Sequence, residues 1–350
     1  MLQLGTVEIA HPFVQAALSG YSDPPMRAIA RRHGAAYTLN EVVLDKLVIT
    51  RGKGQKRVLR PVEPDDHPVG GQLMGANPDD FGPAARLLAD AGYDVIDINF
   101  GCPVRKVLGR CRGGFLLSQP EAALEIVARV MDAVGADRPV TVKMRRGLDD
   151  SAESERNFFA ILNGAFALGV CAITVHGRTV EQRYVGPSRW AFLKRVKAHA
   201  GDRVILGSGD LFSAPACLDM MAETGVDGVT IARGAIGNPW IFRDCLALAA
   251  GEPLPEPPSI VEQGATIAAH FAESVRCHGA DRAGALMRKF GIKYSELHPC
   301  ARAVRDAFIA MRTTDDFQGL IDAWYNPAGD YPPVTRRTSH GDLIAAGATL

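Results

Sequence analysis

Eight short apolar runs, each rich in β-favouring residues, alternate with segments of helical periodicity along the first 240 or so residues. Strands this short and this apolar are typical of a parallel sheet that is buried on both faces. The eightfold alternation predicts a closed (β/α)8 barrel, and an open doubly wound sheet is the alternative. The runs lie at 12–18, 35–39, 69–73, 94–98, 139–143, 172–175, 204–207 and 228–232.

The segments between the runs carry recognisable helix boundaries. Residues 77–92 open with Asn-Pro and end at a glycine, and residues 118–135 open with Ser-Gln-Pro and also end at a glycine. Residues 213–225 follow the same pattern. Proline near the start and glycine just past the end are the usual signs of a helix, so these segments are predicted to be helical.

The alternation stops at 251–259, which contains four prolines. This stretch predicts a linker between a barrel over 1–250 and a smaller domain over 260–325. Periodicity within 260–325 is helical throughout, so this second domain is predicted to be all-helical. The remaining residues, 326–350, show no clear pattern and are predicted to be irregular.

Charge and cysteine content exclude several classes of protein. With 39 basic and 39 acidic residues, the formal net charge is zero, so a nucleic acid would have to be held by local patches. The seven cysteines are scattered and lack CxxC spacing, which favours a reducing compartment, the cytoplasm, over a disulfide framework or a zinc site. The sequence shows no signal peptide, no membrane span and no HExxH, Walker A or GxGxxG motif. We expect a monomer without a metal.

Polar residues follow the predicted strands at the end where the active sites of such barrels lie. They are Gln72, Asn99, Cys102, Lys143, His176 and Arg178. A barrel that served only as a scaffold would not need a polar group at each of these positions. An amide, an ammonium and an imidazole in one pocket suit the edge of a heterocyclic ligand.

The last two predicted strands are followed by glycine-rich segments, at 207–210 and 232–240. Barrels often bind phosphate between these two loops, where glycines allow backbone N–H groups to approach an anion. Arg233 can add a charged contact. Either loop alone is better explained as a tight turn, but together they favour a phosphate site. With Gln72, Lys143 and His176 they fit flavin mononucleotide (FMN) better than a sugar phosphate.

Cys102 lies between a glycine and a proline, just after the fourth predicted strand. A free cysteine is most often a buried apolar residue, but a loop at the mouth of a barrel is not core. A thiol with an ordinary pKa near 8.5 is protonated at neutral pH and can act as a general acid. Cys111, nine residues further on, is the rival candidate.

Six ordered motifs, together with the stretch around 16–27, resemble the tRNA-dihydrouridine synthase family. The motifs occupy 71–75, 97–107, 140–147, 173–186, 207–211 and 232–242. The similarity spans the barrel, and the helical region after Ile260 resembles the family's C-terminal domain. The resemblance implies that NADPH reduces a bound FMN, that hydride then passes to C6 of a uracil in tRNA, and that Cys102 protonates C5.

The resemblance also implies roles for individual residues. Those placed against the flavin are Ala17, Leu18, Ser19, Gln72, Lys143, His176, Ser208, Gly209, Asp210, Ala232 and Arg233. Those placed against the substrate are Asn99, Arg178 and Tyr184. Three positions depart from the family's usual pattern: Ala17-Leu18 replaces Pro-Met, Ser208 replaces Asn and Ala232 replaces Gly. These contacts are largely made by backbone, so FMN binding is expected to survive.

Clusters of basic residues provide the charge that a tRNA would need. They are Arg105, Lys106, Arg110 and Arg112 beside Cys102, Arg145 and Arg146 beside Lys143, five in 51–60, and 288–293. Each cluster alone is usually a solvated face, but four in a neutral chain favour phosphate contacts. Two alternatives remain open. One is an FMN barrel acting on a free pyrimidine or small enone, and the other is a non-catalytic RNA-binding flavoprotein.

Overall fold

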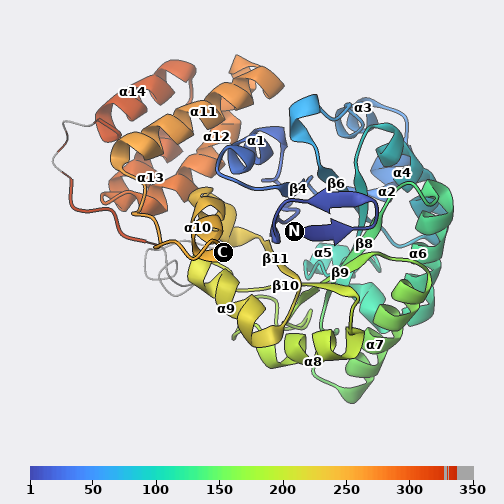
Figure 1. Ribbon diagram of the computed structural model, residues 1–350. Coiled ribbons are helices and arrows are strands. Elements are labelled where there is room, and N and C mark those ends of the chain that lie inside the picture. Colours follow the sequence, from blue (N-terminus) through green and yellow to red (C-terminus); the bar gives the residue numbers. More distant parts are fainter. Residues whose placement is uncertain (327–328, 330, 337–350) are drawn as a thin grey trace. The chain divides into compact units, whose positions relative to one another are not determined.

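The computed structural model describes residues 1–326, 329 and 331–336 (Figure 1). The chain forms two compact units. Unit 1 comprises Met1–Ser19, Ala36–Gly209 and Asp219–Thr230. Unit 2 comprises Gly20–Ala35, Asp210–Leu218 and the chain from Ile231 onward. Most of the stretch predicted to be an irregular tail lies outside the described residues.

Eight parallel strands close into the predicted barrel. β4 pairs with both β3 and β6, and β11 pairs with β3, so the sheet has no free edge within this ring. A short extra strand, β5 (Val43–Leu44), pairs with β6. The barrel strands are β3 (Phe13–Gln15), β4 (Tyr37–Leu39), β6 (Val69–Met74), β7 (Val95–Phe100), β8 (Val140–Arg145), β9 (Ala172–His176), β10 (Val204–Ser208) and β11 (Gly228–Ile231). The fold prediction is therefore confirmed.

Helices connect the strands of unit 1 and cover the outside of the barrel (Figure 1). The predicted helices are present as α4 (Pro78–Asp90), α6 (Pro120–Val134) and α9 (Ala214–Thr224), the last of which is divided between the two units. Proline is one of the first residues of α4 and α6, where its missing N–H has no partner to lose. The other helical segments are α2 (Asp45–Ile49), α3 (Lys53–Val58), α5 (Arg105–Leu108), α7 (Ala152–Ala167) and α8 (Trp190–Ala200), with 3-10 turns η1 (Pro64–Asp66) and η2 (Gly113–Ser118).

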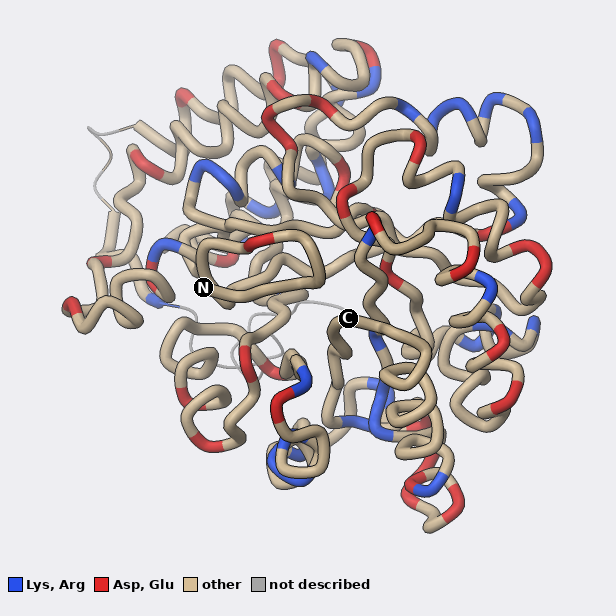
Figure 2. Tube along the Cα trace, turned by 45° about the vertical axis from the view of Figure 1, so that its right-hand side comes forward, with Lys and Arg blue, Asp and Glu red and all other residues tan. Residues whose placement is uncertain are grey.

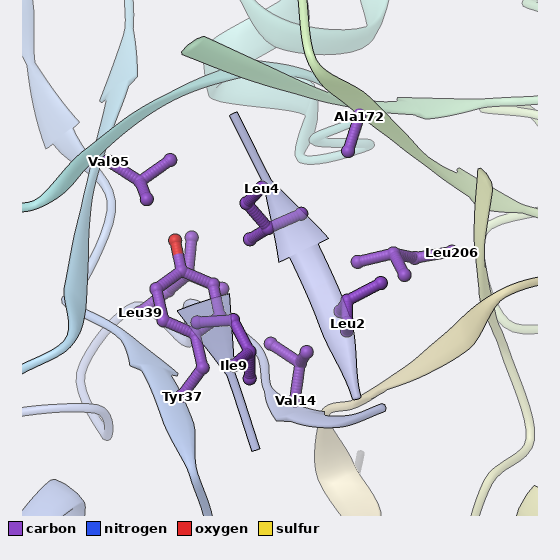
Figure 3. Packing of buried hydrophobic residues seen from close by; sticks show 9 residues of the cluster. All are labelled: Leu2, Leu4, Ile9, Val14, Tyr37, Leu39, Val95, Ala172 and Leu206. Atoms are coloured by element: carbon purple, nitrogen blue, oxygen red, sulfur yellow. The ribbon is translucent and has the colours of Figure 1, made fainter. Parts of the chain in front are cut away.

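An antiparallel hairpin, β1 (Leu2–Leu4) and β2 (Val7–Ile9), lies against the amino-terminal ends of the barrel strands. Its side chains Leu2, Leu4 and Ile9 are buried against residues that begin strands, such as Val95 and Ala172 (Figure 3). The hairpin thus fills one end of the barrel, which we call the amino end. The sequence analysis did not predict these two strands.

Unit 2 is predominantly helical, in agreement with the predicted helical C-terminal part. Within it, α1 packs against α11 and α11 packs against α12. His33 Nε2 lies 3.2 Å from Thr266 Oγ1, and Arg32 forms an ion pair with Glu273. Its helical segments are α1 (Pro24–Arg32), η3 (Arg233–Ala235), α10 (Trp240–Ala249), α11 (Ile260–His278), α12 (Ala280–Tyr294), η4 (Ser295–Leu297), α13 (Ala301–Ala310) and α14 (Thr314–Trp324).

The start of α11 shows why the helical part begins where it does. Ser259 accepts a hydrogen bond from the backbone N–H of Glu262, and the Glu262 carboxylate accepts one from the backbone N–H of Ser259. This capping box satisfies N–H groups that an uncapped helix would leave without partners. None of the described helices is long and apolar enough to cross a membrane.

Candidate active site

The carboxyl end of the barrel carries a group of polar side chains from neighbouring strands. A Cβ added at Gly70 would meet Tyr37 and Leu39 of the interior, so Gln72, two residues on, also faces inward. The strand register then sets Gln72 beside Asp97 and Asn99 beside Lys143. Sequence reasoning placed Gln72, Asn99 and Lys143 in one site, and the structure brings them together on β6, β7 and β8.

Hydrogen bonds link three of these side chains. Gln72 Nε2 donates to Asp97 Oδ2 over 2.6 Å, and Asn99 Nδ2 donates to Gln72 Oε1 over 2.7 Å. The other carboxylate oxygen of Asp97 accepts from Thr141 Oγ1 over 2.5 Å. Asp97 and Thr141 were not among the predicted site residues. The available signal was an acidic residue at an inward-facing position in an otherwise apolar strand.

Burial shifts the pKa of two charged groups at this end of the barrel, Asp97 and Lys143. It raises the pKa of Asp97 to about 6, although the hydrogen bonds from Thr141 and Gln72 and the charge of Lys143 oppose the rise. Burial lowers the pKa of Lys143 to about 8, helped by Arg145 and opposed by Asp97. At neutral pH the site therefore contains a carboxylate and an ammonium that offset part of each other's desolvation.

Cys102 is held in place through its backbone. Its N–H donates to Asn99 Oδ1 over 3.1 Å, and its carbonyl accepts from the N–H of Gly114 over 3.1 Å. A Cβ at Gly113 would lie 2.9 Å from the Cβ of Cys102, so the loop needs a glycine there. Burial raises the pKa of the Cys102 thiol, so the thiol is protonated at neutral pH and able to act as an acid.

Cys111 differs from Cys102 in its surroundings. Cys111 is exposed, whereas Cys102 is half-buried. The backbone of Cys111 has φ +54°, in the left-handed region that L-residues rarely adopt. Among the described residues, the backbone N–H of Cys102 is bonded to Asn99, whereas no such contact links Cys111 to Gln72 or Asn99. The choice of Cys102 over Cys111 as the acid stays a prediction.

Arg145 joins two loops at this end of the barrel. Its Nε donates to the carbonyl of Gly101 over 3.0 Å, and its Nη1 donates to the carbonyls of Thr179 and Arg183, each over 2.7 Å. Its guanidinium also lies over the ring of Tyr184, with the Cζ atom 5.6 Å from the ring centroid. It therefore connects the Cys102 loop to the loop after β9.

The expectation that Arg145 and Arg146 offer open positive charge at the mouth is wrong. They are only 3% and 7% exposed, because their guanidinium groups are engaged with neighbouring loops. Arg178, 2% exposed, donates through Nε to the carbonyl of Gly186 over 2.8 Å and so holds the same loop. Its contact with substrate stays a prediction, as does that of Tyr184, which is 40% exposed.

His176 and the start of the first predicted phosphate loop, Ser208 and Gly209, lie together in unit 1. The register pairs His176 with Ser208, and a Cβ at Gly209 would come 2.6 Å from the His176 ring. Gly209 also has φ +113°, so only glycine fits there without strain. Ala17, Leu18 and Ser19, just after β3, belong to the same unit.

The remaining predicted phosphate residues belong to unit 2. Asp210 Oδ1 and Arg233 Nη2 are 3.8 Å apart, and the Arg233 guanidinium lies over the ring of Phe212. Ala232 comes directly before Arg233 at the end of β11. Their contact with a flavin phosphate stays a prediction.

The side chains of unit 1 fit the edge of a flavin ring. Gln72, Asn99 and Lys143 all carry N–H donors near the ends of adjacent strands, and a flavin ring offers carbonyl oxygens and ring nitrogens as acceptors. Within the part of the chain that the structure describes, hydrogen bonds use one N–H of each amide in the Asp97–Gln72–Asn99 network. The second N–H of each amide is then available for a ligand.

Lys and Arg residues are spread along the chain (Figure 2), and two of the predicted basic clusters lie in unit 1 with exposed side chains. In and around α3 the exposed residues are Arg51, Lys53, Lys56, Arg57 and Arg60. In the Cys102 loop they are Arg105, Lys106 and Arg110, while Arg112 is half-buried. In unit 2, by contrast, the Lys293 ammonium donates to Glu296 over 3.0 Å and Lys289 donates to the carbonyl of Gly20.

Comparison with known sequences gives consistent results. A family model described as dihydrouridine synthase matches residues 14–324. A probable tRNA-dihydrouridine synthase of Mycobacterium tuberculosis is 34% identical over 336 residues, covering 92% of this chain and 84% of the relative. The tRNA-dihydrouridine synthase B of Xanthomonas axonopodis pv. citri is 34% identical over 331 residues, covering 91% of this chain and 97% of the relative.

Solved structures share the barrel at much lower sequence identity. An old yellow enzyme homologue from Zymomonas mobilis superposes with a TM-score of 0.54 at 14% identity, covering 73% of this chain and 93% of that one. Morphinone reductase in complex with tetrahydroNAD gives a TM-score of 0.54 at 14% identity, covering 73% and 91%. At this level of identity the likeness concerns the fold.

Proposed function

Because the chain belongs to the dihydrouridine synthase family, we propose that its barrel binds FMN and reduces uridines in tRNA to 5,6-dihydrouridine, with NADPH as reductant. When bound, FMN supplies the hydride that adds to C6 of the uracil. Gln72, Lys143 and His176 would hold the flavin ring. Ala17, Leu18, Ser19, Ser208, Gly209, Asp210, Ala232 and Arg233 would complete the flavin site.

The observation that carries this proposal is the state of Cys102. Its thiol is kept protonated by burial, and its loop is fixed by Asn99 and Gly114 beside the polar side chains of β6 to β8. In the reduction, the S–H bond of Cys102 breaks and a C–H bond forms at C5 of the uracil. The thiolate that remains takes a proton from water before the next turnover.

Lys143 and Asn99 support the same step. As hydride reaches C6, negative charge develops on the uracil ring and its C4 carbonyl. The Lys143 ammonium and the second N–H of the Asn99 amide would stabilise that charge, and their neighbouring positions on β8 and β7 support this role. Tyr184 and the loop held by Arg145 and Arg178 would contact the nucleotide that carries the base.

The tRNA would be bound by the exposed basic residues of α3 and of the Cys102 loop. Such contacts are made with phosphates and do not read sequence. The uracil has to leave its stack to reach a flavin in the barrel, which is how enzymes that modify bases gain access to them.

The direct test measures FMN in the purified protein and dihydrouridine in tRNA. We expect FMN to be released on denaturation, and tRNA lacking dihydrouridine to gain it in the presence of NADPH. Free uridine and UMP serve as controls for a small-molecule reductase. A protein that takes up no FMN, or one that reduces free uridine as well as tRNA, would contradict the proposal.

A further inference from the structure

A continuous chain of hydrogen bonds runs from the barrel interior to the backbone of Cys102, and its inner end is Asp97. We propose that Asp97 is a positioning residue: its carboxylate fixes the orientation of the Gln72 amide, and through Gln72 and Asn99 it fixes the loop that carries Cys102. The importance of that loop for turnover rests on the function proposed above.

At the outer end of this hydrogen-bonded chain, the Asn99 amide can take only one orientation. Asn99 Oδ1 accepts from the backbone N–H groups of Gly101 and Cys102, over 3.0 and 3.1 Å. Backbone N–H groups can only donate, so the Asn99 amide must present its oxygen to them and its nitrogen to Gln72. Gln72 must then present its oxygen to Asn99.

The inner end imposes the same polarity. With its oxygen toward Asn99, Gln72 directs its nitrogen toward Asp97. An ionised carboxylate can only accept hydrogen bonds, so it matches this orientation and would oppose the reverse one. The Asp97 pKa of about 6 keeps it ionised at neutral pH. Thr141 donates to the second carboxylate oxygen and holds the carboxylate in the position that Gln72 requires.

The consequence for a ligand is a fixed pattern of donors. Among the described residues, each amide uses one N–H inside the hydrogen-bonded chain, so Gln72, which is 1% exposed, and Asn99 each keep a second N–H that an acceptor on a ligand could use. If the Gln72 amide were free to rotate, a fraction of the protein molecules would hold it flipped. In those molecules Gln72 would present its oxygen to the ligand, and its nitrogen would face the Asn99 nitrogen without an acceptor between them. Asp97 therefore keeps the site a uniform donor surface.

Stability alone does not account for an aspartate here. Asp97 is 2% exposed within the barrel, and burying a carboxylate there is costly compared with an apolar residue of the same size. The titratable groups that face it are Lys143 on β8, which offsets part of this cost, and Cys171 just before β9. A residue kept in spite of its cost points to a role in the site.

The test uses the full chain and compares two substitutions at one position. Asp97→Asn keeps an acceptor for Gln72, because its own nitrogen can face the Thr141 hydroxyl. Asp97→Leu removes the acceptor while keeping the same number and branching of side-chain heavy atoms. Thr230→Val is the matched control. It also removes a buried hydroxyl, which lies 3.5 Å from Thr174 Oγ1 and does not belong to the hydrogen-bonded chain from Asp97 to Cys102.

The first readout needs no flavin: the rate at which iodoacetamide alkylates Cys102 in the apoprotein, followed by mass spectrometry of the peptide that contains it. We expect Asp97→Leu to raise this rate at least tenfold, because the loop loses its anchor. Asp97→Asn and Thr230→Val should stay within about threefold of the parent. Equal rates for Asp97→Leu and Thr230→Val would overturn the proposal.

The second readout is coupling with Gln72. Gln72→Leu breaks the chain one step further out, so it should raise the alkylation rate as much as Asp97→Leu, and the double variant should rise no further. If the increase in alkylation rate in the double variant equals the product of the two single increases, Asp97 does not act through Gln72. If Asp97→Leu does not fold, Gln72→Leu alone still tests the proposal, because an unchanged alkylation rate of Cys102 in that variant would refute it.

In protein loaded with FMN, the same variants separate positioning from simple loss of structure. We expect Asp97→Leu to shift the absorption spectrum and reduction potential of the flavin, and Thr230→Val to leave both unchanged. Failure of the parent protein to bind FMN would refute the cofactor, whereas unchanged alkylation would refute the positioning role. The two outcomes are therefore distinguishable.

Discussion

The two ends of the barrel are built from the same eight strands but have opposite character. At the amino end, Leu2, Leu4 and Ile9 of the hairpin fill the interior together with Val14 and Val95 (Figure 3). At the carboxyl end, the inward positions a few residues further along the strands carry amides, a carboxylate and an ammonium.

β7 shows the change within one strand. Its inward residues are Val95, then Asp97, then Asn99, so the interior passes from apolar to charged to amide over four residues. The difference teaches that one end of the barrel is responsible for stability and the other for chemistry, as is general for this fold. Mutations at the amino end should therefore change the free energy of unfolding, and mutations at the carboxyl end should change turnover.

The largest expected effect concerns Cys102. We predict that Cys102→Ala lowers dihydrouridine formation about 10²- to 10⁴-fold, the usual contribution of a general acid, while FMN binding and reduction by NADPH are retained. The measurement is single-turnover reduction of tRNA by the reduced enzyme. Cys111→Ala is the matched control and should stay near the parent, and the reverse ranking would assign the acid to Cys111.

The next effect belongs to the amino end. Leu4 is fully buried in the hairpin cluster, so Leu4→Ala should lower the free energy of unfolding by about 2–5 kcal/mol. Turnover by the protein that remains folded should be unchanged. Gln3→Ala, at the exposed position between the two buried leucines, is the control. A Leu4→Ala enzyme of parental stability but reduced turnover would contradict the division between the ends.

A smaller effect is expected from the exposed charges of α3. Replacing Lys53, Lys56 and Arg57 together by alanine should weaken tRNA binding about tenfold and flatten its dependence on salt, by about one unit of logarithmic slope for each lost phosphate contact. Binding is measured over a series of salt concentrations. The double variant Arg86→Ala/Arg129→Ala removes exposed charges of α4 and α6 instead and should bind normally.

The smallest effect is a dependence on pH. Lys143 has a pKa of about 8 in the folded chain, below its value of 10.5 in the unfolded chain. Between these values the unfolded chain binds one proton more, so stability should rise with pH, by roughly 1–3 kcal/mol. Thermal unfolding from pH 7.5 to 10.5 measures this rise, and Lys143→Met should lack it.

Activity should change in the opposite direction with pH. The Lys143 ammonium is lost as the pH rises through about 8, so turnover that depends on it should fall there. Lys143→Arg keeps its charge and should move the fall to higher pH. A parent enzyme whose chemical step is constant from pH 7 to 10 would show that the ammonium is not needed.

Much of the barrel could be predicted because each of its strands corresponds to a short apolar run of β-favouring residues in the local sequence. The run 94–98 became β7 (Val95–Phe100) and the run 139–143 became β8 (Val140–Arg145), a difference of one or two residues at each end. The hairpin at the amino end was not predicted, because its three-residue strands are too short for a periodic signal.

The candidate site was predictable to a more limited extent. Gln72, Asn99 and Lys143 follow from the rule that functional groups cluster at the ends of barrel strands. Asp97 lies inside an apolar run, and the signal for it, its position two residues before Asn99 on the same face of the strand, was not used. Arg145 was expected to be open to solvent, and the structure shows it bonded to three carbonyls.

The sequence by itself determined the alternation of strands and helices, the end of the barrel that carries the polar side chains, and the family, because these depend on residue type and order. Only the tertiary structure decided which polar side chains meet and with what polarity. The register between β6 and β7 sets Gln72 beside Asp97 and near Asn99, and hydrogen bonds between residues 25 or more apart in the chain depend on that register.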